Sequence, residues 1–270
     1  MTTEIATTYV GSVCNLTMHP PAGKPPTLDY GVIDALESAL ADINHCAGEL
    51  IAVVLQSSSP RFFCAGANLK VMAAIDENSI EPWVQRGHRL MNQLEALPLP
   101  VIAKVEGYAM GGGLELAMAC DLIIASSEAR FAQSEARLGL VTGWGGCRRL
   151  VRRVGLSRAK ELCFTGRMVE PTEAVDIGLA DWQGETDQLH TYLGLILEEI
   201  RQNSRVAVRE MKKILGTGEY NGPEDAATIE AAASRRCLAE GDAVERVQRF
   251  LRAKSKSRTG GTTAAPVDDT

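Results

Sequence analysis

The sequence predicts an α/β fold in which buried strands alternate with helices and a helical region follows. Short apolar runs rich in branched residues occur at 50–55, 101–105 and 122–125, and continuous runs of this kind are typical of strands buried on both faces. Segments with helical spacing of apolar residues separate these runs, and such segments also fill the last third of the chain. This alternation favours parallel pairing of the strands.

Prolines and turn residues divide the N-terminal half into elements. The segment 9–18 alternates weakly between apolar and polar residues, and four prolines within 20–26 then interrupt the backbone. A helix is predicted next, because apolar residues recur at helical spacing at Ile33, Leu36, Leu40 and Ile43. Two further helices are predicted at 82–97 and at 111–120, and the second of these begins at three consecutive glycines.

The remainder of the chain is predicted to be mostly helical. The expected helices are 158–164, 172–177, 187–201, 206–215 and 223–251, the last interrupted near Gly241. We expect a core domain over 1–200 and a helical subdomain over 201–254. Residues 255–270 are small and polar, with too little apolar surface to offset the entropy of ordering, so we expect a disordered tail there.

Composition excludes several classes of partner. The 270 residues carry a net charge of −6, so no basic excess indicates nucleic acid or an anionic membrane. The seven cysteines include no C-x-x-C pair, which favours reduced thiols over a disulfide framework or a zinc site. The first ten residues lack the features of a secretory signal, and no apolar run reaches the roughly 18 residues of a membrane span. We therefore expect a cytoplasmic protein.

Two glycine-containing turns could direct backbone N–H groups at one ligand. In the first, over 62–69, an apolar run ends in small residues that let a ligand approach the backbone closely. In the second, over 107–117, three glycines precede a helix whose unpaired N–H groups attract developing negative charge. Either turn alone is more often a simple tight turn. Together they could form an oxyanion hole.

Four motifs follow one another along the chain: F-C-A-G-A-N-L, then G-Y-A-M-G-G-G-L-E-L-A-x-x-C-D, then F-A-Q-S-E-A-R-L-G-L, then G-W-G-G. Their order and spacing resemble the crotonase (enoyl-CoA hydratase/isomerase) superfamily, from about residue 5 to residue 254. The resemblance implies a spiral of ββα units followed by helices that mediate assembly into a homotrimer or a dimer of trimers. It also implies an acyl-CoA thioester as substrate and no metal or redox cofactor, since coenzyme A is part of the substrate.

Motif position implies roles for four residues. Ala67 and Gly112 correspond to the two oxyanion-hole N–H donors, and Glu115 and Glu135 to the glutamates that flank the water in the hydratases. Syn hydration needs a base for the water and an acid for the α-carbon, which two carboxyls can supply. Taken alone, Glu115 would be interpreted as a surface-facing helical residue. Both glutamates at both family positions favour catalysis.

The resemblance also implies contacts to coenzyme A and to the acyl group. The first turn would bracket the adenine and phosphates through Cys64, Ala65, Gly66, Leu69 and Lys70, although Lys70 is equally typical of a solvated lysine. Gly143 and Trp144 would lie near the acyl end. Phe250 and Lys254 match a terminal segment in which an aromatic residue and a lysine help to close over coenzyme A.

The sequence departs from the hydratase pattern at three positions. Asn68 stands where aspartate is usual, Ser134 replaces a common proline, and Trp144 replaces a small residue. Trp144 either fills space near the acyl end or packs beneath the helical subdomain. A W-G-G motif also occurs in family members that decarboxylate malonyl-type thioesters, but those tend to lack the second carboxylate. The presence of Glu135 therefore keeps hydration ahead of decarboxylation.

Two alternatives stay open at this point. Double-bond isomerisation or decarboxylation could use the same oxyanion hole, and a non-catalytic binding homologue is a more distant possibility. A basic run is interpreted mainly as a solvated face and secondarily as a phosphate contact: Arg148, Arg149, Arg152, Arg153 and Arg158. The histidines fit no metal-ligand spacing: His19, His45, His88 and His190.

Overall fold

The computed structural model describes residues 2–217 and 223–259. The chain divides into two compact units, Met1–Gln202 and Asn203–Thr270. Each unit is described by itself.

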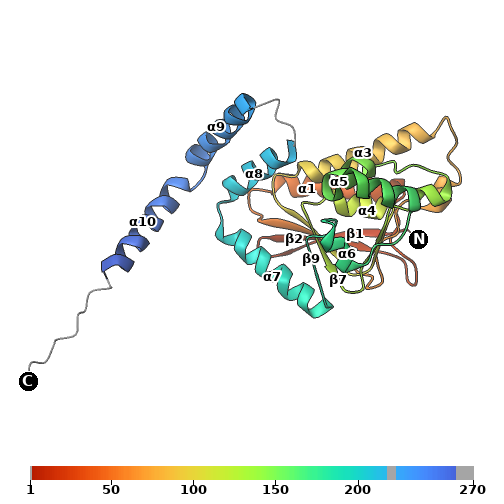
Figure 1. Cartoon of the computed structure of the whole chain (residues 1–270), viewed down its shortest axis with the longest axis horizontal. Coiled ribbons are helices and arrows are strands. Elements are labelled where there is room, and N and C mark those ends of the chain that lie inside the picture. Colours follow the sequence, from red (N-terminus) through yellow and green to blue (C-terminus); the bar gives the residue numbers. More distant parts are fainter. Residues whose placement is uncertain (1, 218–222, 260–270) are drawn as a thin grey trace, which may run out of the picture. The chain divides into compact units, whose positions relative to one another are not determined.

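A six-stranded mixed sheet forms the centre of the first unit (Figure 1). Its strand order is β1-β2-β3-β5-β7-β9, where the strands are β1 (Glu4–Val10), β2 (Val13–His19), β3 (Ala52–Ser57), β5 (Val101–Val105), β7 (Leu122–Ser126) and β9 (Trp182–Gly184). The three predicted strands are β3, β5 and β7, and they pair in parallel as expected. The weakly alternating segment 9–18 instead spans the turn of an antiparallel hairpin between β1 and β2.

Three short strands form a second, parallel sheet: β4 (Phe62–Cys64), β6 (Tyr108–Met110) and β8 (Arg130–Ala132). Each follows one strand of the main sheet and precedes a helix, which produces the repeated ββα units that the resemblance implied. Strands of three residues are too short to show a periodic pattern, so only the resemblance predicted them. Because these strands are parallel, the turns that follow them lie at the same edge of the small sheet.

The helices of the first unit are α1 (Tyr30–His45), α2 (Leu69–Met72), α3 (Ile80–Ala96), α4 (Gly112–Met118), the 3₁₀ helix η1 (Glu135–Leu138), α5 (Gly146–Thr165), α6 (Pro171–Asp176) and α7 (Thr186–Gln202). Helix α1 begins after Asp29, whose carboxylate accepts a hydrogen bond from the Val32 N–H at 3.0 Å. The prediction of 158–164 covered only the end of α5. A break at Gly155, with φ of 75°, divides α5 and obscured its length in the apolar pattern.

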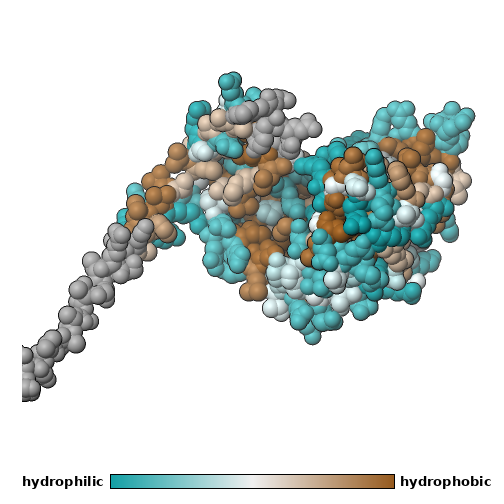
Figure 2. Space-filling view, in the orientation of Figure 1, coloured by the Kyte–Doolittle hydropathy of each residue, from teal (hydrophilic) through white to brown (hydrophobic). Residues whose placement is uncertain are grey.

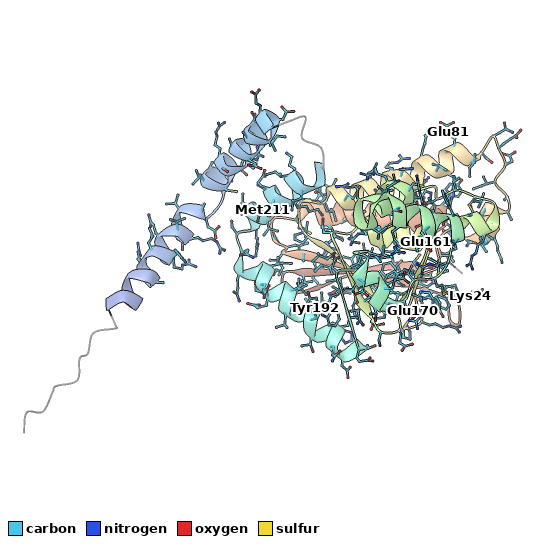
Figure 3. All side chains as sticks on the ribbon, in the orientation of Figure 1. Lys24, Glu81, Glu161, Glu170, Tyr192 and Met211 are labelled. Atoms are coloured by element: carbon cyan, nitrogen blue, oxygen red, sulfur yellow. The ribbon has the colours of Figure 1, made fainter. Side chains whose placement is uncertain are left out.

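Both faces of the main sheet are covered. Val53 and Leu55 of β3 belong to the large core cluster that also contains buried residues of α1, α3 and α4. The alternate residues Ala52 and Val54 pack instead against side chains of α7. Tyr192 of α7, labelled in Figure 3, stacks on Trp182 of β9 with ring centroids 4.4 Å apart. Coverage of both faces explains why the strands are continuously apolar.

The second unit contains α8 (Arg205–Thr217), α9 (Pro223–Glu240) and α10 (Ala243–Thr259). The expected break near Gly241 separates α9 from α10. Arg236 of α9 donates to the buried carboxylate of Glu210 in α8 at 2.8 Å. Apolar side chains lie exposed along α9 and α10 (Figure 2): Leu238, Val244, Val247, Phe250 and Leu251. Residues 255–259, which we expected in the tail, are part of α10, and 260–270 lie outside the described residues.

Candidate active site

The turns that follow β4 and β6 approach each other closely. A Cβ atom at Gly66 would lie 2.7 Å from the Met110 carbonyl oxygen and 2.9 Å from the Gly112 nitrogen. A Cβ atom at Gly112 would lie 3.4 Å from the Ala67 nitrogen. Gly66 also has a φ of 89°, which a residue with a side chain rarely adopts. Glycine at these positions therefore allows the two turns to meet.

The N–H groups of Ala67 and Gly112 are available to a ligand. Hydrogen bonds on either side hold Ala67, since the Leu28 N–H donates to the Gly66 oxygen and the Asn68 N–H donates to the Leu28 oxygen, each at 2.8 Å. Gly112 is the first residue of α4, where an N–H has no partner within the helix. Within the described ranges, neither N–H donates to a protein acceptor. The two N–H groups therefore lie close together where the two turns meet.

Glu115 is buried, with 2% of its surface exposed, so its interpretation as a surface-facing residue is wrong. Its Oε1 accepts three hydrogen bonds, from the Thr142 hydroxyl at 2.6 Å, the Trp144 N–H at 2.8 Å and the Gly146 N–H at 2.7 Å. Burial raises the pKa of Glu115, while these three donors and the charge of Arg149 oppose the rise. All three hydrogen bonds are to Oε1, and none of them is to Oε2.

Glu135, the first residue of η1, has a less polar environment. Its Oε1 accepts one hydrogen bond, from the Gln133 side chain at 2.8 Å, and its Oε2 is buried without a partner among the described residues. Burial, followed by the charge of Glu115, raises the pKa of Glu135 to about 7. A Cβ atom at Gly111 would lie 3.0 Å from Oε1, so this carboxyl group lies directly beside the second turn.

The two carboxyl groups differ in how they are stabilised. The negative charge of Glu115 contributes to the raised pKa of Glu135. Three donors stabilise a carboxylate at Glu115, whereas Glu135 accepts one side-chain hydrogen bond and has a buried oxygen without a partner among the described residues. The structure thus places two unequally stabilised carboxyl groups next to the second glycine-containing turn.

Trp144 lies against the second turn with 3% of its surface exposed. Its six-membered ring would be 2.6 Å from a Cβ atom at Gly112, and the five-membered ring would be 2.0 Å from one at Gly87 of α3. The structure thus places Trp144 beside an expected oxyanion donor. Gly143 precedes it and is half-buried next to Val84.

The remaining residues of the first turn differ in exposure. Cys64 is buried, and burial raises its thiol pKa to about 12, while Ala65 is half-buried. Leu69 and Lys70 are exposed at the start of α2. Asn68 caps that helix through a hydrogen bond from the Lys70 N–H at 3.0 Å. An aspartate at this position could make the same cap, so the departure keeps the turn but removes a charge.

Two predicted contacts to coenzyme A belong to the second unit. Phe250 lies on α10 with 67% of its surface exposed. Lys254 follows on the same helix, and its side chain lies outside the described residues. The roles of both residues stay predictions.

Several contacts of the site were not predicted. Thr142, Gly146 and Gln133 donate to the two glutamates. Gln133 and Gly146 lie within quoted motifs and Thr142 directly precedes one, but none of the three was assigned a role. Arg149 is 2% exposed, so assigning it to a solvated face was wrong. Its guanidinium donates to the Trp144 carbonyl at 2.8 Å, to Asn92 at 3.0 Å and to Glu95 at 2.8 Å. No local pattern distinguishes Arg149 from its exposed neighbours.

No group of three or more His, Cys, Asp or Glu residues among the described residues is placed to hold a metal ion. None of the helices within those ranges is long and apolar enough to cross a membrane.

The spiral of ββα units, with two glutamates and two free N–H groups at the edge of its small sheet, defines an enzyme of the crotonase superfamily. A sequence model of the enoyl-CoA hydratase/isomerase family matches residues 8–257, and the chain belongs to this family.

Individual relatives are similar over most of their length. A short-chain-enoyl-CoA hydratase of Clostridium acetobutylicum is 33% identical over 89% of this chain and 92% of its own. A crotonyl-CoA hydratase of Syntrophomonas wolfei is 35% identical over 74% of this chain and 76% of its own. The crystal structure of an enoyl-CoA hydratase from Bacillus anthracis superimposes with a TM-score of 0.86 at 32% identity, covering 92% of this chain and 96% of that one. The family match and these hydratase relatives confirm the prediction that the protein is a hydro-lyase.

Proposed function

We propose that the protein catalyses the reversible syn addition of water to a 2-enoyl-CoA thioester. The observation that carries the proposal is the unequal pair of carboxyl groups: Glu115 with three donors on one oxygen, and Glu135 with a bare buried oxygen and a pKa of about 7. The names of the hydratase relatives support the same reaction.

Polarisation of the thioester is the first requirement. Its carbonyl oxygen would accept hydrogen bonds from the N–H groups of Ala67 and Gly112, which stabilise the negative charge that develops when water adds at C3. Loss of one such donor typically lowers the rate by about 10² to 10³.

Proton transfer is the second requirement. Glu115 would take a proton from the water while the water oxygen bonds to C3, and Glu135 would donate its proton to C2. Both transfers occur on the face of the substrate that the carboxyl groups share, which makes the addition syn. The pair carries one proton before and after the step, so the reverse dehydration uses the same groups. Because the chemistry needs only proton transfer, we propose no metal or redox cofactor, and dialysis against a chelator should leave the rate unchanged.

Glutamine substitutions test the mechanism. Glu115→Gln and Glu135→Gln should each lower kcat for crotonyl-CoA hydration by at least about 10²-fold, because an amide cannot exchange the required proton. Glu77→Gln, at an exposed glutamate, serves as the matched control. Full activity in both site variants would contradict the proposal.

Labelled water separates hydration from its rivals. Oxygen from the water should enter the product, whereas an isomerase would exchange only carbon-bound hydrogen and a decarboxylase would release carbon dioxide. Failure to bind any CoA thioester in calorimetry would instead favour a non-catalytic homologue.

We also propose a homotrimer or a dimer of trimers. The exposed apolar side chains of α9 and α10 support association. The surface of a monomer usually carries apolar residues singly, whereas here they form a series along two helices. Analytical ultracentrifugation measures the assembly directly, and a monomer at micromolar concentration would contradict it.

A further inference from the structure

The indole of Trp144 forms a wall beside the proposed reacting atoms. Its six-membered ring would lie 2.6 and 2.8 Å, at Cζ3 and Cε3, from a Cβ atom at Gly112. The backbone N–H of the same residue donates to Glu115 at 2.8 Å. Trp144 therefore adjoins both an oxyanion donor and the carboxylate that would activate water.

Neighbouring groups hold this wall in place. Trp83 packs against it with ring centroids 5.0 Å apart, and Tyr30 packs edge-on against Trp83 at 4.9 Å. The indole N–H points to the Trp83 carbonyl oxygen at 3.4 Å, and Gly87 removes the side chain that would otherwise collide with the five-membered ring. With 3% of its surface exposed, Trp144 is packed among protein atoms.

This geometry restricts the acyl group. A substrate whose carbonyl accepts hydrogen bonds from Ala67 and Gly112 would place its acyl carbons near Gly112. Trp144 occupies the space against Gly112, and Trp83 and Tyr30 pack behind it. A smaller residue at 144 would leave that space open next to Gly112.

We propose that Trp144 is a specificity-determining residue that limits the substrate to short acyl chains. The proposal rests on the proposed function, because it concerns the acyl group of the same thioester. Each methylene that a pocket accepts or rejects typically changes kcat/KM by about 10- to 200-fold. The wild-type protein should therefore lose activity steeply between four-carbon and eight-carbon 2-enoyl-CoA substrates.

The test measures kcat/KM for 2-enoyl-CoA substrates of four, six, eight and ten carbons. Trp144→Leu should raise the eight-carbon to four-carbon ratio by at least about tenfold over wild type. Trp144→Phe removes less volume and serves as a second variant if Trp144→Leu fails to fold. It should shift the chain length with the highest kcat/KM toward six carbons. Trp182→Phe is the matched control, because this tryptophan lies on the edge strand β9 and stacks on Tyr192 of α7.

The outcomes distinguish the two proposals. A wild-type protein inactive on all four substrates would overturn the proposed function. A wild-type protein equally active from four to ten carbons would overturn the limit set by Trp144. Folded Trp144 variants with the wild-type chain-length profile would also overturn it.

Discussion

At the scale of single residues, the carboxyl groups of Glu115 and Glu135 differ in how they are stabilised. Glu115 accepts three hydrogen bonds on one oxygen, while Glu135 accepts one and has a pKa raised to about 7 by burial and by its neighbour. Local sequence does not explain this difference, since Glu115, which accepts three hydrogen bonds, lies among apolar residues, and Glu135 lies among mixed ones. It arises from the segments that pack around them.

This difference predicts a pH profile. The proposed reaction needs one proton on the pair, so kcat/KM should fall as pH rises above about 7, where Glu135 loses its proton. The equilibrium constant of the reaction does not depend on pH, so hydration and dehydration must show the same falling limb. Initial rates in both directions over about pH 5 to 9 check this. A kcat/KM that does not fall between about pH 7 and about pH 9 would refute the requirement for one proton on the pair.

Arg149 is predicted to position the site from behind Trp144. Arg149→Met leaves the Trp144 carbonyl and Asn92 without their donor, and the loss of a buried charge partner typically destabilises by about 3 kcal/mol. The charge of Arg149 also lowers the pKa of Glu115, so its removal should shift the acid limb of the pH profile, where Glu115 takes up a proton, to higher pH. A purely structural role would leave that limb in place.

Arg148 provides the control for this prediction. It pairs with the same Glu95 carboxylate at 2.7 Å, but 52% of its side chain is exposed. Arg148→Met should cost less than about 1 kcal/mol and leave the pH profile unchanged. Urea unfolding measures the stability of both variants, and kcat/KM as a function of pH measures their rate profiles.

At the scale of elements, α3 and the segment that carries Trp144 fit together through one glycine. A methyl group at Gly87 would lie 2.0 Å from the indole, so Gly87→Ala should destabilise by about 1–3 kcal/mol. In Trp144→Leu the collision disappears, and the same change should cost much less. A double-mutant cycle with urea unfolding would then show a coupling energy of at least about 1 kcal/mol, and additive effects would argue against the contact.

Gly194 of α7 provides the control for Gly87→Ala, because it is a glycine within a helix that does not contact the indole. Apart from its chain neighbours and the backbone of its own helix, no atom of the described residues lies within 4 Å of the place where its Cβ would be. Gly194→Ala should therefore be neutral or stabilising by up to about 1 kcal/mol, because alanine favours helix more than glycine does.

At the scale of the whole molecule, the raised pKa of Glu135 should lower the free energy of unfolding. The pKa of Glu135 is about 7 in the folded protein and 4.5 when unperturbed, so between these values the unfolded chain releases a proton that the folded chain keeps. The free energy of unfolding should therefore fall as pH rises through this window and level off above about 7. Glu135→Gln removes the titrating group, and the variant should be more stable than wild type by about 1–3 kcal/mol at about pH 8.

Urea unfolding at about pH 5 and about pH 8 tests this trade-off between stability and activity. The stability difference between variant and wild type should be larger at the higher pH. Glu77→Gln, at an exposed position, should show no such change. A difference independent of pH would mean that Glu135 titrates normally in the folded protein.

Much of the fold was predictable because burial leaves a periodic pattern. Ile33, Leu36, Leu40 and Ile43 line the buried face of α1, as their spacing indicated. Apolar runs likewise marked β3, β5 and β7. The hairpin of β1 and β2 was missed because β1 has no buried face and its alternation is weak.

Of the candidate site, the sequence by itself determined the order of the motifs, and with it the family and the positions of Ala67, Gly112, Glu115 and Glu135. Only the tertiary structure decided what those residues touch. Thr142 and Gly146 donate to Glu115 across 27 and 31 positions of the chain, and Gly87 of α3 contacts the indole of Trp144, which lies in the loop before α5. The reason is physical. Periodicity records that one face of a segment is buried, whereas the identity of its neighbours depends on long-range packing that no local pattern contains.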